Sequence, residues 1–232
     1  MEAPLGRRAR HRKDMERRIL ELGREQLATV GAAGVSLRAV ARELGVASSA
    51  VYRYVASRDE LLTLLIAQSY DALGDAVDDA LDPVPGDDAD ARWTTLGRAT
   101  RAWAVRRPHD WALLYGSPVP GYHAPPERTL AGGTRLVGHV LDIARTLHVA
   151  GRAAPAGATV AARGVADTEV RAADPAAAEL PSDLLVAATT AWTLLIGSVS
   201  SEVFQQLGPL GDGYAALHET NVATGLRLLR GS

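Results

Sequence analysis

The sequence predicts an all-α protein that consists of a small N-terminal helical domain and a larger helical body. Apolar residues recur at three- and four-residue spacing in every major segment, and no stretch shows the alternation typical of a strand. Clusters of proline and glycine, such as the one at 82–86, separate these segments. A chain of 232 residues, 47% of them hydrophobic, has enough apolar surface for one or two domains with cores.

Residues 36–60 carry the most specific pattern in the chain. A short amphipathic helix ends at Gly45, where glycine permits the positive φ of a sharp turn, and a second short helix follows. The small Ala41 lets Val46 and Val51 fold back against the first helix. This is the layout of a helix-turn-helix, whose second helix enters the major groove of DNA. The apolar face of the first helix consists of Leu37, Val40, Ala41 and Leu44, with Ser36 as its predicted N-cap.

A basic arm and one helix precede this motif, and a long helix follows it. The arm, residues 6–13, contains five Arg or Lys side chains and has no predicted conformation. It is expected to lie along a DNA backbone, to enter a minor groove, or to act only as a soluble tail. A first helix is expected over 14–30. Ser57 and Glu60 form a capping box that predicts a fourth helix running to about Leu81.

The body is expected to contain further helices and one long connection. Residues 150–181 are mostly Ala, Gly, Pro and small polar residues, which predicts a mobile connection with at most short helical pieces. The stretch that begins at Trp111 starts as a helix and becomes irregular at Gly116. The other predicted helices cover about 91–107, 127–148, 184–207 and 214–229.

From about residue 13 to residue 65 the chain resembles the DNA-binding domain of TetR-family transcriptional regulators. Two positions depart from the family pattern: Ala47 replaces a serine that caps the recognition helix, and Val55 replaces a phenylalanine. The missing cap costs about 1 kcal/mol and leaves the register of the recognition helix open by one residue. The segments that carry the resemblance are 36–41, 43–46, 50–54 and 57–61, in unbroken order.

The body resembles the C-terminal domain of the TetR subgroup named for a Trp-His-Gly motif. Here the motif reads Trp192, Ile196 and Gly197, so no role of the histidine carries over. Together the two resemblances imply an N-terminal arm and helix-turn-helix domain over 1–60 and a regulatory and dimerisation domain over 61–232.

The first resemblance also implies which residues contact DNA. Arg38 is expected to give two hydrogen bonds to a guanine, and the short side chains of the recognition helix permit close approach to bases. Tyr54 is equally open to a packing role, and Arg58 is expected to contact a phosphate. The predicted DNA-binding residues are Arg38, Ser48, Ser49, Ala50, Tyr52, Arg53, Tyr54 and Arg58.

Charge is distributed unevenly, which agrees with a DNA-binding end. Residues 1–60 hold twelve Lys or Arg and eight Asp or Glu, hence +4, whereas the remainder hold thirteen and nineteen, hence −6. A symmetric dimer on a palindromic operator is expected, with the last two helices as its interface. The stripe Leu185, Ala188, Trp192, Leu195 belongs to that interface or packs inside one subunit.

The aromatic side chains of the body predict an apolar pocket for a small-molecule effector, although each could simply fill the core. The family resemblance implies that such a ligand releases a repressor from its operator. The predicted pocket residues are Trp103, Trp111, Tyr115, Tyr122, His123, His139 and Trp192.

A helical enzyme or metal protein without a DNA role is the alternative. Its only support is His109-Asp110 and the pair His139 and Asp142, three residues apart. The chain has no cysteine and no phosphate-binding or nucleophile motif, so no cofactor and no catalytic residue is predicted. A nonspecific DNA-coating protein is disfavoured because the basic excess is confined to one end. With no apolar run near the roughly 20 residues of a membrane span, the protein is expected to be cytoplasmic.

Overall fold

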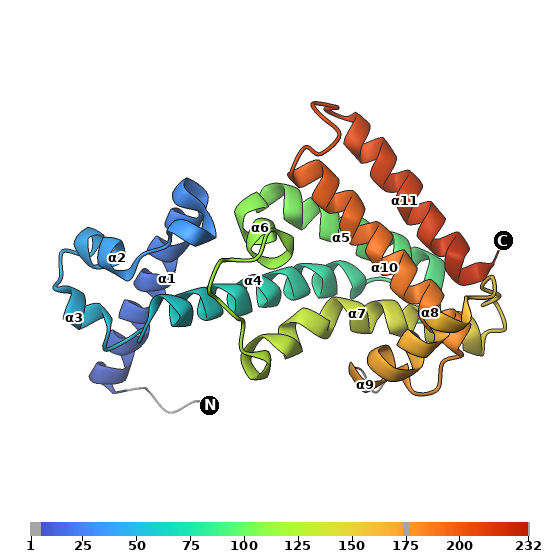
Figure 1. The fold of residues 1–232 in the computed structure, drawn as a ribbon, viewed down its shortest axis with the longest axis horizontal. Helices are drawn as coiled ribbons and strands as arrows, with labels where there is room; N and C mark the ends of the chain where they lie inside the picture. The colour runs from blue at the N-terminus through green and yellow to red at the C-terminus, as the bar shows by residue number, and fades with distance from the viewer. Residues whose placement is uncertain (1–5, 174–176, 232) are drawn as a thin grey trace. The chain divides into compact units, whose positions relative to one another are not determined.

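The computed structural model describes residues 6–173 and 177–231, and the secondary structure of these ranges is helical, with no strand (Figure 1). The predicted all-α class is therefore confirmed. The chain forms two compact units. Unit 1 comprises Met1–Asp71 and His109–Leu130, and unit 2 comprises Ala72–Pro108 and Ala131–Ser232. The predicted division into functional domains at residue 60 stays a prediction, because compact units follow packing alone.

Unit 1 is built from three N-terminal helices, the start of a long fourth helix and one short helix from the middle of the chain. Its core is formed by the apolar faces predicted for the helix-turn-helix, and the unusual Val55 is buried in it. Pro108 begins α6, where its missing N–H needs no partner. The elements are α1 (Arg7–Gly34), α2 (Leu37–Glu43), α3 (Ser48–Val51), the first part of α4 (Arg58–Leu81) and α6 (Pro108–Tyr115).

Helix α1 begins at Arg7, so the predicted start of the first helix at residue 14 is wrong and most of the basic arm is helical. Arginine and lysine are good helix formers, and no glycine or proline separates Arg7 from the amphipathic part of the helix. An ion pair from Arg12 Nε to Glu16 Oε1 at 2.7 Å, four residues apart, supports the added turns. The helix kinks near its other end at Gly31, whose φ is +67°.

Unit 2 contains the last part of α4, most of α7, and the C-terminal helices. Figure 1 shows α10 and α11 side by side, and both also pack on α5. Three short helical pieces lie within the Ala-rich stretch 150–181, and the first two of them pack on α10, while residues 174–176 of that predicted connection lie outside the described residues. The elements are α5 (Ala89–Arg106), α7 (Pro126–Val149), α8 (Val160–Val165), the π-helix η1 (Ala166–Val170), α9 (Arg171–Ala173), α10 (Ser182–Val203) and α11 (Gly213–Arg230).

Among the described residues, α10 is the one helix that is long and apolar enough to cross a membrane, contrary to the expectation from the sequence. The fold gives this composition another explanation. Leu184, Leu185, Leu195 and Val199 are buried within unit 2, as in the core helix of a soluble protein. A single helix of this kind is weak evidence for a membrane span.

Helix α11 lies close to α5 because two glycines leave room for large side chains. Gly97 of α5 faces Val222, and Gly225 of α11 faces the ring of Trp93. Trp93 is fully buried, and its indole Nε1 donates to the Val222 carbonyl at 2.7 Å. The indole N–H of Trp93, the only polar group of this buried side chain, therefore has a hydrogen-bond partner.

Beside this contact His218 of α11 is also buried. Its Nε2 lies 3.0 Å from the Gly97 carbonyl and its Nδ1 lies 3.1 Å from the Ser198 hydroxyl. Burial lowers the pKa of His218, which favours the neutral imidazole. Since the carbonyl can only accept, Nε2 carries the proton and Nδ1 accepts from Ser198. The imidazole therefore joins α5, α10 and α11 through neutral hydrogen bonds.

Substituting Gly225→Ala should destabilise the protein. The new Cβ would lie 2.5 Å from Cζ2 of the immobile Trp93 ring. Overpacking of this kind costs about 1–3 kcal/mol, more than the roughly 0.5–1 kcal/mol gained when alanine replaces a helical glycine. Urea titration followed by circular dichroism measures the free energy of unfolding. Gly164→Ala in α8, where no heavy atom lies within 4 Å of the new Cβ, is the matched control and should be neutral or stabilising.

Candidate nucleic-acid interface

The turn between α2 and α3 has the geometry that the sequence predicted. Gly45 adopts a φ of +68°, and the Val46 amide donates to the Ala41 carbonyl at 3.0 Å. Ala41 and Val51 are both buried, so the two helices are in close contact. Ser36 occupies the N-cap position of α2, but its side chain makes no capping bond; instead its amide donates to Gln26 Oε1 at 2.8 Å. Helix α2 is therefore anchored by α1.

Helix α3 is short and has no side-chain cap. Its N-cap residue is Ala47, and no side chain caps its first amides. The Ala50 amide instead donates to the Ala47 carbonyl at 2.8 Å, so the turn that begins α3 is closed by the backbone.

The predicted DNA-binding residues of α2, of α3 and of the turn that follows α3 differ in exposure. Arg38, Ser49, Tyr52 and Arg53 are exposed, and neither arginine pairs with a carboxylate in the described part of the chain. Ser48 and Ala50 are half-buried. The exposed side of the helix-turn-helix thus presents two free guanidinium groups, one phenol and one hydroxyl, which are hydrogen-bonding groups suited to phosphates and base edges.

Tyr54 lies in a different environment from these residues. It is half-buried and packs against the core of unit 1. The Arg12 guanidinium lies over its ring, with Cζ 5.8 Å from the ring centroid. Of the two roles that the sequence left open for Tyr54, this placement favours packing.

Arg58 is held by the end of α1. Its Nη2 donates to the carbonyls of Ala32 and Ala33, both at 3.1 Å, and its Nε donates to that of Val35 at 3.2 Å. The last carbonyls of a helix lack partners within the helix, so Arg58 satisfies them. A phosphate would have to compete with these carbonyls for the guanidinium.

The predicted effector residues are divided between the two units. Unit 1 holds Trp111 and Tyr115, whose ring centroids are 4.4 Å apart, and Tyr70 meets Tyr115 edge-on at 6.4 Å. Burial raises the pKa of both tyrosines. The Tyr122 hydroxyl lies 2.9 Å from that of Thr63, and His123 is exposed.

In unit 2, Trp103 is buried, whereas Trp192 lines a largely apolar cavity. This cavity, of about 280 Å³, lies between α7, η1 and α10. Sequence reasoning based on aromatic residues missed the rest of its lining, which is mainly aliphatic. The apolar spacing of Val137, Val140 and Leu141 on α7 could have indicated it. The lining residues are Thr134, Val137, Val140, Leu141, Glu169, Val170, Ala188, Thr189 and Trp192.

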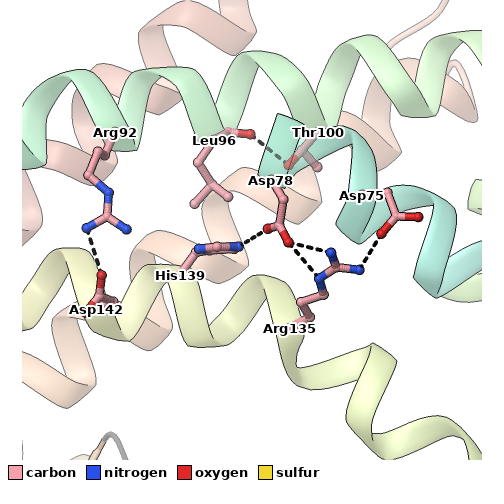
Figure 2. Close-up of polar contacts among 8 residues, drawn as sticks. All are labelled: Asp75, Asp78, Arg92, Leu96, Thr100, Arg135, His139 and Asp142. Carbon is pink, nitrogen blue, oxygen red and sulfur yellow. Dashed lines mark hydrogen bonds and ion pairs between the residues drawn. The ribbon is translucent and has the colours of Figure 1, made fainter. Parts of the chain in front are cut away.

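His139 belongs to an ionic cluster that joins α4 to α7 (Figure 2). Its Nε2 lies 2.6 Å from Asp78 Oδ1. Arg135 binds the other oxygen of Asp78 and donates to Asp75 at 2.9 Å. Burial opposes the ionisation of Asp78, but the hydrogen bonds from Arg135 and His139 prevail and lower its pKa.

His139 and Asp142, the pair considered as metal ligands, each bind a different side chain. Asp142 accepts from Arg92 at 2.7 Å, while His139 faces Asp78 (Figure 2). No group of three His, Asp or Glu side chains within the described residues has the geometry to hold a metal ion. The pair therefore gives little support to the metal-protein alternative.

A helix-turn-helix with exposed basic side chains, followed by a helical body, defines the class of helix-turn-helix transcriptional regulators. The family pattern described as "Bacterial regulatory proteins, tetR family" matches residues 19–65. The pattern described as "Tetracyclin repressor-like, C-terminal domain" matches residues 93–224. The chain belongs to the TetR family of transcriptional regulators, as the first resemblance predicted.

Individual relatives agree with this assignment. HTH-type transcriptional regulator Rv1816 of Mycobacterium tuberculosis is 43% identical over 220 residues, covering 88% of this chain and 87% of that protein. Mb1846 of Mycobacterium bovis, with the same description, gives the same values. The crystal structure of SCO4313, a candidate regulatory protein, has a TM-score of 0.78 at 30% identity and covers 97% of this chain and 99% of its own.

More distant structures share the fold alone. The TetR-family transcriptional regulator PfmR from Thermus thermophilus has a TM-score of 0.56 at 18% identity, covering 92% of this chain and 97% of its own.

Substituting Asp78→Asn should weaken the α4–α7 contact in unit 2. The pKa of Asp78 is lowered by folding, so its contribution to stability is present above the ordinary carboxylate pKa of about 4 and is lost as the pH falls through the folded value. The variant should lose about 1 kcal/mol at neutral pH and show a shallower loss of stability in acid. Urea titrations across pH measure this. Asp79→Asn, an exposed neighbour on the same helix, should leave the acid profile unchanged.

Substituting Arg58→Lys should destabilise unit 1 in the absence of DNA. A lysine cannot reproduce donation from two nitrogens to three carbonyls, so we expect a loss of about 1–2 kcal/mol. Thermal and urea unfolding of the free protein test this. The same change at the unpaired Arg53 is the control and should be neutral. Equal stability of both variants would mean that the Arg58 bonds contribute nothing.

Proposed function

We propose that this protein is a repressor that binds a palindromic operator as a homodimer and is released by a small apolar ligand. The observation that carries the DNA-binding part is the free, exposed set Arg38, Ser49, Tyr52 and Arg53 on the helix-turn-helix of a TetR-family chain. The site of action is the cytoplasm, where bacterial DNA lies.

Each part of the interface has its own role in this proposal. Arg38 binds a guanine edge in the major groove, and Ser48, Ser49 and Ala50 pack closely against bases. Tyr52 and Arg53 bind phosphates. Tyr54 supports the interface by packing. Arg58 holds the end of α1, and a phosphate binds its guanidinium only in competition with the carbonyls there.

The proposed dimer uses α10 and α11, but not the α10 stripe named from the sequence. Of that stripe, Leu185, Ala188 and Leu195 are buried within their own subunit, and the half-buried Trp192 lines the cavity. The helices keep other apolar groups exposed near their connection, namely Phe204, Leu207, Leu210 and Leu217. These side chains would be covered by the same helices of a second subunit, and a two-fold dimer matches a palindromic operator.

Release by a ligand requires different affinities for two conformations of the protein. The aliphatic cavity beside Trp192 is the best-supported site for an apolar ligand. Helix α4 runs without interruption from residues of unit 1 to residues of unit 2, and the Asp78 cluster ties its latter part to α7. A ligand that displaces α7 would thereby act on α4.

Selection of bound duplexes from a random pool, at about physiological salt to suppress nonspecific binding, tests the proposal. We expect a palindrome with half-sites about one helical turn apart. Arg38→Ala should weaken binding to the selected site by about 1–3 kcal/mol per half-site and relax the preference at one base pair of each half-site. Recovery of no common sequence would refute sequence-specific regulation. Recovery of an unpaired half-site would refute the dimer.

A further inference from the structure

The added turns of α1 concentrate positive charge beside the helix-turn-helix. Five Arg or Lys residues lie between Arg7 and Lys13, and the first acidic residue after them is Asp14. The side chains of Arg7 and Arg8 lie outside the described part of the chain, but Arg10, Arg12 and Lys13 are exposed. Because these residues are helical, their spacing on the surface is fixed.

Two of these cations have no carboxylate partner among the described residues. Arg12 bonds to Glu16, and Arg17 on the next turn lies 3.1 Å from Glu21 and 3.6 Å from Asp14. Arg10 and Lys13 have no carboxylate partner in the described ranges. They are three residues apart, so they lie on one side of the helix. Their charge is therefore available to an external anion.

The position of these turns is set by the recognition motif itself. Arg12 lies over the ring of Tyr54, which follows α3 and is anchored in the core of unit 1. The first turns of α1 and α3 both belong to unit 1 (Figure 1). Through Arg12, the first turns of α1 contact the residue that directly follows Tyr52 and Arg53 in the chain.

We propose that Arg10 and Lys13 bind backbone phosphates of DNA next to the segment contacted by α3, and that Arg12 and Tyr54 position them there. This inference rests on the proposed DNA-binding function and assigns a further part of its interface. Phosphate contacts add affinity and fix the register of the protein on DNA, but they carry no base information. The turns from Arg7 to Lys13 extend α1 by roughly 10 Å, or about three base pairs of contour.

The test compares the salt dependence of DNA affinity for the full-length protein and its variants. Arg10→Gln/Lys13→Gln should bind at least about tenfold more weakly at roughly 0.15 M salt, and the slope of log K against log salt should fall by about two per subunit, or about four for the proposed homodimer. The loss should be equal on a selected site and on a scrambled duplex. Shortening the duplex by about three base pairs at each end should weaken the native protein but not the double variant.

Arg106→Gln, which removes one exposed and unpaired charge from α5, is the control and should leave the slope unchanged. Tyr54→Phe keeps the ring and should behave like the native protein. Tyr54→Leu, with folding verified by circular dichroism, should lower the slope like the double variant and add nothing when combined with it.

Three outcomes would overturn the inference. The first is an unchanged salt slope in the double variant, and the second is a loss confined to the selected site, which would indicate base recognition. The third is a normal slope for Tyr54→Leu, which would remove the positioning role. If the native protein showed no preference for any sequence, the proposed function would fail, while the slope on scrambled DNA would still test Arg10 and Lys13.

Discussion

The burial of one face of α4 is the constraint on which both compact units depend. Leu61, Leu62 and Leu65 are fully buried in unit 1, and Leu73 and Val77 are fully buried in unit 2. Removing such side chains from water is the main favourable contribution to folding. Since these residues belong to one uninterrupted helix, each unit requires α4 to stay helical in the part that it uses. The Ser57 hydroxyl, which accepts from the Glu60 amide at 3.0 Å, fixes where this helix begins.

The polar contacts of α4 complement this apolar face. Gly74 lies where Arg135 crosses the helix, and a Cβ there would lie 2.5 Å from the guanidinium Nη1. The glycine thus permits the approach that lets Arg135 reach both Asp75 and Asp78. Ion pairs that are this exposed contribute no more than about 1 kcal/mol to stability, and they also fix the position of α7 against α4 in unit 2.

The surface proposed to bind DNA combines side chains that are bonded to the backbone with side chains that have no partner among the described residues. Gln26 and Arg58 hold the ends of α1 and α2 through bonds to backbone groups. In contrast, α3 lacks a side-chain cap, and Arg38, Arg53, Arg10 and Lys13 lack partners in the part of the chain that the structure describes. Groups left unpaired on a well-supported scaffold can bind an anionic partner without first breaking internal bonds, which lowers the cost of recognition.

The sequence by itself determined the fold class, the helix-turn-helix and most helix positions, because these follow from apolar periodicity, Gly45 and the Ser57 cap. It also identified the family, because the ordered residues of the motif are local. Tertiary structure alone decided which side chains are free. Arg38 and Arg58 look alike in sequence, but only Arg58 meets the carbonyls of α1. The burial of the α10 stripe, the division of the aromatic residues between two units and the Asp78 cluster likewise depend on contacts between residues far apart in the chain, which local patterns do not encode.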